Sequence, residues 1–200
     1  MPGRRNLIRL LGGIFIVSML TACGVNNIPE YDEQVKATWS QVENQYQRRA
    51  DLIPNLVNTV KGYADFERST LEAVVNARAR VGSIQADSSL VSNPELLAKF
   101  EAAQGELAGA LQRLMVVVER YPDLKANQNF LQLQAQLEGT ENRISVARRD
   151  YIEAIKRYNA EIRTFPGRLW HSMLYSDMEL REDYYKATSE DAEKAPPVKF

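Results

Sequence analysis

Few side chains in this sequence are of the types that commonly do chemistry. The chain has one histidine, His171, and one cysteine, Cys23. A zinc site built from histidines needs several of them, and a single histidine leaves no redundancy for a histidine-paired nucleophile. His171 stands between Trp170 and Ser172 in an expected loop, so we interpret it as a surface or packing residue.

Acidic side chains are abundant, but their pattern does not indicate an active site. They gather in residues 177–183 and 190–193. A glycoside hydrolase needs two carboxyl groups on opposite sides of a cleft, and these runs are more typical of solvated surface charges. The glycines form no phosphate-binding loop. We therefore expect no catalytic residues, no metal and no cofactor.

Cys23 follows an N-terminal segment with the layout of a secretory signal. Three arginines precede an apolar stretch at residues 10–20, as in the basic and apolar regions of such signals. A stretch of this length cannot span the roughly 30 Å apolar core of a bilayer, which needs about 20 helical residues. The segment ends in Leu20-Thr21-Ala22-Cys23. We predict that residues 1–22 are a leader that is cleaved from the protein.

The ending of this leader resembles the lipobox of bacterial lipoproteins, in which the cysteine sulfur receives a diacylglycerol. We expect Cys23 to carry this lipid and residues 23–30 to tether the exported protein to a bacterial cell membrane. Gly24 stands where an aspartate would resemble an inner-membrane retention signal. In a cell with two membranes, the periplasmic face of the outer membrane is therefore the favoured location.

The chain from Cys23 onward is acidic overall. The leader holds three of the 25 basic residues and none of the 26 acidic ones, which leaves a formal charge of −4. A protein of this charge has no general attraction for polyanions. The composition therefore argues against nucleic acid as a partner.

Apolar residues recur every three or four positions along most of the chain, which predicts long amphipathic helices. The pattern runs through residues 35–81, 96–121 and 130–158. Asn93-Pro94 predicts the start of the second helix, Pro122 its end, and Phe165-Pro166-Gly167 the end of the third. Such helices joined by short loops predict an all-α, antiparallel up-and-down bundle at residues 31–167. A C-terminal segment with an extended tail is expected at residues 168–200.

Pro54 leaves the number of helices open. Proline inside a helix costs about 3 kcal/mol, yet the apolar spacing continues through it and favours one kinked helix of about 50 residues. In the other interpretation Asp51 caps a new helix and Pro54 lies in its first turn, where no amide donor is needed. The bundle has three long helices in the first case and four in the second.

The segment around Pro54 is also the candidate binding site. Its spacing places Arg49 on the buried face of the helix. One interpretation is structural: a kink together with a local arginine–aspartate pair. In the other, the segment is a docking notch for a protein partner, because proline frees a backbone carbonyl and arginine supplies forked donors. On this hypothesis the contact residues are Arg48, Arg49, Asp51 and Asn55.

The same segment carries a resemblance to a known family. Residues 48–63 resemble the hallmark stretch of the LemA family of bacterial envelope proteins, and residues 76–79, 119–127 and 195–200 are similar to further parts of it. The resemblance covers nearly all of residues 31–200. It implies a helical bundle held at the membrane. It implies no catalytic residue or cofactor, because the family has no agreed biochemical function.

Two departures from the family pattern affect what the resemblance implies. Family members usually begin with a membrane-spanning helix, where this chain has a lipoprotein-type leader. Residues 165–185 begin with the expected Pro-Gly but lack the apolar stretch that is usual in the family. The acidic residues there argue against a membrane contact by this segment.

The leading hypothesis is a lipid-anchored adaptor or scaffold that binds another envelope protein without catalysing a reaction. An alternative is self-assembly into a homo-oligomer, because a first helix of about 50 residues would overhang a second of about 28 and leave apolar residues exposed. A hydrolase that acts on the cell wall is the least favoured alternative.

Overall fold

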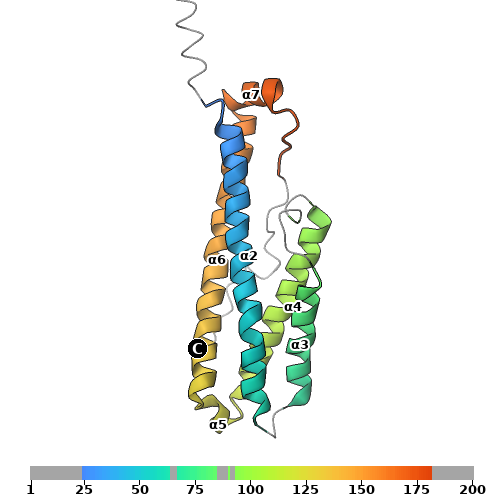
Figure 1. Ribbon diagram of the computed structural model, residues 1–200, viewed down its shortest axis with the longest axis vertical. Coiled ribbons are helices and arrows are strands. Elements are labelled where there is room, and N and C mark those ends of the chain that lie inside the picture. The colour runs from blue at the N-terminus through green and yellow to red at the C-terminus, as the bar shows by residue number, and fades with distance from the viewer. Residues whose placement is uncertain (1–23, 64–66, 85–89, 91–92, 182–200) are drawn as a thin grey trace, which may run out of the picture. The chain divides into compact units, whose positions relative to one another are not determined.

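The computed structural model describes residues 24–63, 67–84, 90 and 93–181 (Figure 1). These residues form helices only: α2 (Asn27–Lys61), α3 (Arg68–Gly82), α4 (Pro94–Val118), α5 (Pro122–Lys125), α6 (Gln128–Arg163) and α7 (Gly167–Leu174). The all-α prediction is confirmed. The predicted leader, Cys23 and the C-terminal tail from residue 182 lie outside the described residues.

The chain divides into two compact units. Unit 2 is Lys36–Tyr151, and it holds most of α2 and α6 together with α3, α4 and α5. The described part of unit 1 is residues 24–35 and 152–181, which include the start of α2, the end of α6 and all of α7.

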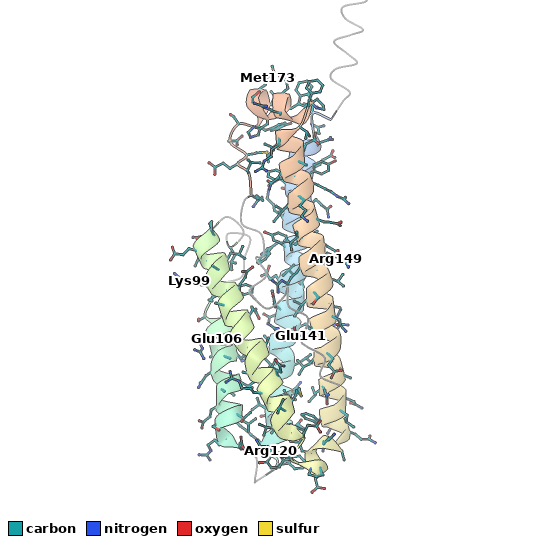
Figure 2. The ribbon with its side chains drawn as sticks, turned by 180° about the vertical axis from the view of Figure 1, so that it is seen from behind. Lys99, Glu106, Arg120, Glu141, Arg149 and Met173 are labelled. Atoms are coloured by element: carbon teal, nitrogen blue, oxygen red, sulfur yellow. The ribbon has the colours of Figure 1, made fainter. Side chains whose placement is uncertain are left out.

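Helices α3 and α4 of unit 2 are antiparallel neighbours. Near one end of the pair, Arg80 Nε lies 3.2 Å from Glu106 Oε2. At the other end, Arg120 Nη2 lies 2.9 Å from Glu67 Oε1. Figure 2 shows Glu106 of α4 and Arg120, which follows the end of α4, at different heights. Exposed ion pairs of this kind contribute little energy, but they show the direction of the two helices.

Helices α2 and α6 of unit 2 are also antiparallel. The rings of Trp39 and Tyr151 are 5.2 Å apart, and Arg143 Nε donates a hydrogen bond of 3.2 Å to Gln45 Oε1. Figure 1 shows α2, α3, α4 and α6 side by side in this unit. The up-and-down bundle is thus confirmed for unit 2, where the four long helices alternate in direction.

Aromatic side chains form a cluster in the core of unit 2. Trp39 and Tyr46 of α2 both lie against Phe100 of α4, with ring centroids 6.2 and 5.3 Å apart. All three side chains and Tyr151 of α6 are buried. Edge-to-face pairs of this kind add to the stabilisation from burial alone, so three helices meet at one aromatic cluster.

The first helical stretch divides, but at a place that neither interpretation of Pro54 predicts. Helix α2 continues through Pro54 to Lys61, and α3 begins at Arg68. The expected single helix of about 50 residues is therefore wrong, and so is the expected start of a helix at Asp51. Residues on both sides of the break bury the same kind of apolar stripe, because both helices face one core. Apolar spacing shows which face of a helix is buried, but it does not show whether the helix is continuous.

The predicted helix boundaries elsewhere are mostly confirmed. Asn93 caps α4, since its side chain accepts a hydrogen bond of 3.1 Å from the backbone N–H of Leu96. Helix α4 ends at Val118, and Pro122 begins the short α5. Helix α2 already begins at Asn27, inside the stretch expected to be a tether.

One buried position in α4 is shifted from its prediction. Leu96 was expected in the core but is 38% exposed, whereas Leu97 is 4% exposed. Both leucines lie in the first turn after the Asn93 cap, where either one continues the apolar spacing toward Phe100. Leu97 is the buried residue because it lies two helical turns before Gln104 and four before Leu111, on the same buried face of α4.

In unit 1 the start of α2 packs beside the end of α6. Asn27 Nδ2 donates to Glu161 Oε1 at 3.1 Å. The chain after α7 then returns along α6, where the amide nitrogen of Asn159 donates to the carbonyl oxygen of Arg181 at 2.7 Å. Arg181 Nη2 in turn lies 2.8 Å from Asp32 Oδ1 on α2. These contacts join three segments of unit 1 that are far apart in sequence.

His171 has a packing role within unit 1. Its Nε2 lies 2.9 Å from the carbonyl oxygen of Met178, and the side chain is half-buried. This contact links α7 to the chain that follows it and agrees with the interpretation of His171 as a packing residue.

Gly167 begins α7 at a place where no side chain fits. A Cβ atom there would lie 2.2 Å from the backbone oxygen of Glu161. Contacts that close do not occur between unbonded atoms, so the backbone of α7 would have to move.

We predict that Gly167→Ala lowers the free energy of unfolding by about 1–3 kcal/mol, because α7 must shift away from Glu161. Gly105→Ala is the matched control: nothing lies within 4 Å of a Cβ at that helical position, and alanine should stabilise the helix by about 0.5–1 kcal/mol. Urea denaturation of both variants measures the difference. Equal effects of the two substitutions would show that α7 does not pack against Glu161.

Candidate partner-binding surface on helix α2

The structure separates the four predicted contact residues into two groups. Arg48, Asp51 and Asn55 are exposed and lie on one face of α2, at spacings of three and four residues. Arg49 points the other way and is 2% exposed. The buried position expected for Arg49 is confirmed, and its side chain is not part of the exposed face.

Arg49 is held by groups from two other helices. Its Nη1 donates a hydrogen bond of 2.7 Å to Glu141 Oε1 on α6. Its Nη2 donates to the side-chain oxygen of Gln104 on α4 and, at 3.4 Å, to the backbone oxygen of the same residue. The guanidinium carbon also lies 5.1 Å from the ring centroid of Tyr46. Arg49 therefore links α2, α4 and α6 within unit 2.

A buried guanidinium constrains the positions of the groups around it, because burial removes its charge from water. Its hydrogen-bond partners offset part of that loss, and removing one of them is strongly destabilising. Gln104 is itself buried and satisfies its side-chain oxygen through Arg49. Glu141 is half-exposed, so water weakens its attraction to Arg49. We conclude that the buried contact with Gln104 carries much of the constraint.

The backbone carbonyl freed by Pro54 is occupied within the fold. Proline has no N–H, so the carbonyl of Ala50, four residues earlier, has no donor from its own helix. Arg78 of α3 supplies the donor: its Nε lies 2.9 Å from Ala50 O. The carbonyl expected to form a docking notch therefore joins α2 to α3 instead.

Asp51 does not form the local arginine–aspartate pair of the structural interpretation. Its Oδ1 accepts a hydrogen bond of 2.8 Å from Gln47 Nε2, one turn earlier on the same helix. That part of the interpretation is wrong: Arg49 points into the core, and among the described residues no ion pair joins Asp51 to Arg48.

Asn55 lies at the edge of a groove between α2 and α6. The groove has a volume of about 370 Å³. Its lining residues are Asn55, Asn58, Thr59, Asn129, Gln132, Leu133 and Gln136. Five of these seven side chains are carboxamides and none is charged. We name this feature the amide groove.

Sequence reasoning found Asn55 but missed the rest of the amide groove. The signal was present, because Asn129, Gln132 and Gln136 follow each other at helical spacing and so share a face. The match of that face to Asn55 and Asn58 depends on how α2 and α6 align, which spacing within one helix does not show.

A second groove between α2 and α6, of about 360 Å³, differs in chemistry. It is lined by polar residues of both helices and by the apolar Val146 and Ala147, and it includes the charged Arg143 and Asp150. Both grooves contain polar side chains, so polarity alone does not distinguish the amide groove from the second groove. Its distinction is the concentration of neutral groups that both donate and accept hydrogen bonds.

Glu95 and Glu101 of unit 2 have carboxyl groups with shifted pKa values, but the two do not form an acid–base pair. Burial raises the pKa of Glu101, with Arg148 acting in the opposite direction. A hydrogen bond and the charge of Lys99 lower the pKa of the exposed Glu95.

Within the described residues, no three histidine, cysteine or acidic side chains gather as metal ligands would. Likewise, no described helix has the length and apolar character needed to cross a membrane.

We predict that Arg49→Met lowers the free energy of unfolding by about 2–4 kcal/mol, because Gln104 loses its partner in the core. Arg48→Met is the matched control: it removes the same charge from the exposed face of α2 and should change stability by less than about 0.5 kcal/mol. Urea denaturation measures both. Similar small effects would show that the Arg49 network does not stabilise the bundle.

A double-mutant cycle tests the contact between Arg78 and the freed carbonyl. We predict that Arg78→Met destabilises by about 1–3 kcal/mol, because Ala50 O loses its donor. The loss should be at least about 1 kcal/mol smaller in a Pro54→Ala background, where the new N–H can donate to Ala50 O. Equal losses in both backgrounds would show that the two residues are not coupled through this carbonyl.

Comparison with known proteins places these features in a family. A family model described as LemA family matches residues 38–200. Magnetosome protein MamQ 2 of Paramagnetospirillum magneticum is 27% identical over 188 residues, which cover 86% of this chain and 67% of that protein. Protein LemA of Metamycoplasma hominis is 25% identical over 140 residues, which cover 70% of this chain and 60% of that protein.

A further relative shows the same partial overlap. Magnetosome protein MamQ of Magnetospirillum gryphiswaldense is 26% identical over 150 residues, or 67% of this chain and 55% of its own length. These matches cover between 55% and 67% of the length of each relative. Since the family match itself covers most of the chain, this protein belongs to the LemA family.

Proposed function

We propose that this protein is a non-catalytic adaptor of the bacterial cell envelope, held at a membrane by a lipid on Cys23. In this proposal the adaptor binds a segment of another envelope protein in the amide groove. The observation that carries the proposal is the groove itself, with its five carboxamides on two facing helices.

The chemistry of the groove fits a polypeptide. Each asparagine or glutamine side chain offers both donor and acceptor groups, as the peptide bond does. A neutral groove also avoids the large cost of removing charges from water when a partner binds. A segment with exposed backbone amides or polar side chains would therefore find partners along both walls. Leu133 adds one apolar contact within the groove.

Charged residues beside the groove would orient the partner. Arg48 and Asp51 lie on the same exposed face of α2 as Asn55, two turns and one turn before it, respectively. Opposite charges at the edge of an interface contribute more to orientation and association rate than to affinity. Arg49 acts differently, since it keeps α2 aligned with α4 and α6 from inside the core.

Membrane attachment in this proposal rests on the sequence around Cys23 and on membership of the LemA family. The self-assembly alternative was based on a first helix of about 50 residues, whereas α2 ends at Lys61 after 35 residues. Neither shifted carboxyl group of unit 2 has a catalytic partner, and so no observation favours a hydrolase.

Photo-crosslinking in intact cells tests the proposed binding site. A photoreactive residue replaces Gln132 in the amide groove of the full-length protein, and in a matched variant it replaces Gln112, an exposed glutamine of α4. We expect one major envelope protein to crosslink at position 132 and not at 112. Adding Asn55→Ala and Asn58→Ala should lower that yield about tenfold, the effect of losing about 1.4 kcal/mol of binding energy. Thermal stability should not fall, because alanine favours helix at exposed positions.

Each other outcome of the crosslinking contradicts part of the proposal. Equal products from positions 132 and 112 would show that the amide groove is not the binding site. Crosslinks between copies of this chain alone would replace the adaptor by self-assembly. An unchanged yield in the asparagine variants would remove the carboxamides from the contact.

A further inference from the structure

We propose that α7 lies in the surface of the phospholipid bilayer, as a second membrane contact beside the lipid on Cys23. This inference rests on the proposed membrane attachment and adds to it a contact site on unit 1. It also reverses the expectation that the acidic residues of this segment exclude such a contact.

Four large apolar side chains of α7 and the residues just before it are exposed. Phe165 is 81% exposed, Met173 66%, Leu174 57% and Leu169 45%. Leu169 and Met173 lie one helical turn apart and share a face. Large apolar side chains gathered in one short segment mark an interaction surface more strongly than scattered ones do. Figure 2 shows Met173 at the end of unit 1.

The start of the described chain lies at the same end of unit 1. Glu161 contacts both elements: its carboxylate accepts a hydrogen bond from Asn27, and its backbone lies against Gly167 at the start of α7. Cys23 is only four residues before Asn27 in the sequence, so the two cannot be more than about 14 Å apart. The turn that brings the N–H of Asn27 to Gly24 O, at 3.1 Å, shortens that reach. A lipid on Cys23 would therefore bring α7 to the bilayer.

The polar residues near α7 fit a phospholipid surface. Arg163 and Arg168 are exposed at the end of α6 and in the first turn of α7, where their side chains can reach lipid phosphates. Trp170 is half-buried within the same helix, and tryptophan commonly lies at the level of the headgroups. Basic residues beside exposed apolar ones are typical of helices that lie in the membrane interface.

One acidic residue of the segment, Glu179, lies beside α6. The backbone oxygen of Glu179 accepts a hydrogen bond of 3.0 Å from Tyr158 Oη. Arg181 is bonded to Asn159, and its side chain pairs with Asp32. The chain after α7 therefore runs back past the residues that precede Glu161. The backbone of Glu179 on that path thus lies against Tyr158 and not against the exposed apolar side chains of α7.

Fluorescence quenching in vesicles tests the contact. The full-length lipidated protein is reconstituted into vesicles of phosphatidylethanolamine and phosphatidylglycerol that carry a nitroxide near the headgroup. Cys23 is the only cysteine and is acylated in this proposal, so Met173→Cys provides one thiol for a polarity-sensitive fluorophore. Glu153→Cys is the control, because this exposed residue lies about 12 Å before Glu161 along α6.

We expect the nitroxide to lower the emission of the probe at position 173 roughly twofold or more, since interfacial helices sit about 5–10 Å into the headgroup region. The probe at position 153 should lose much less. Replacing Phe165 and Leu169 by serine should reduce the quenching at position 173, with the protein still bound to the vesicles. Leu169→Cys serves as a second probe position on the same face, with the same expected result.

The outcomes separate this inference from the proposed function. Protein that floats with the vesicles but shows equal weak quenching at positions 173 and 153 overturns the α7 contact alone. Protein that does not float overturns both the lipid anchor and the contact that depends on it. Labelling of the unsubstituted protein by the thiol probe would show that Cys23 is not acylated, with the same consequence for both.

Discussion

The bundle of unit 2 depends on one turn of α2, because that turn carries a buried charge and a carbonyl without a helical donor. Arg49 brings the charge into the core, where Gln104 and Glu141 must meet it. Ala50 carries the carbonyl that Pro54 leaves without a partner, and Arg78 satisfies it. These adjacent residues of α2 thus face groups from all three other long helices. Each group is costly to leave unpaired, so the helices cannot slide past α2 without losing several contacts together.

This alignment also creates the surface that we assign to binding. A shift of α6 by one residue would rotate its side chains by about 100° relative to α2. Asn129, Gln132 and Gln136 would then leave the face opposite Asn55 and Asn58, and the amide groove would be lost. The buried arginine therefore has a functional consequence without touching a partner. It keeps two rows of neutral amides in register, which preorganises the groove and lowers the entropy cost of binding.

The sequence predicted the parts of this structure that depend on local chemistry. Apolar spacing gave the helical class and the burial of Arg49, and Asn93-Pro94 gave the start of α4. Spacing could not show the break after Lys61, because α2 and α3 present the same period to one core. It also could not show the partners of Arg49 and Ala50, which come from distant parts of the chain. The exposed face with Arg48, Asp51 and Asn55 was located, but its role as a site stays a prediction.

The two surfaces proposed here differ in the physical forces that they use, and this difference suits an anchored adaptor. Next to α7, exposed apolar side chains accompany Arg163 and Arg168, which suits a surface that is both apolar and anionic. The amide groove has neither charge nor a large apolar area, so lipid would gain little from entering it. Peptide groups would gain hydrogen bonds there. One chain can therefore keep its membrane contact and its protein contact separate, since each surface is a poor match for the other's partner.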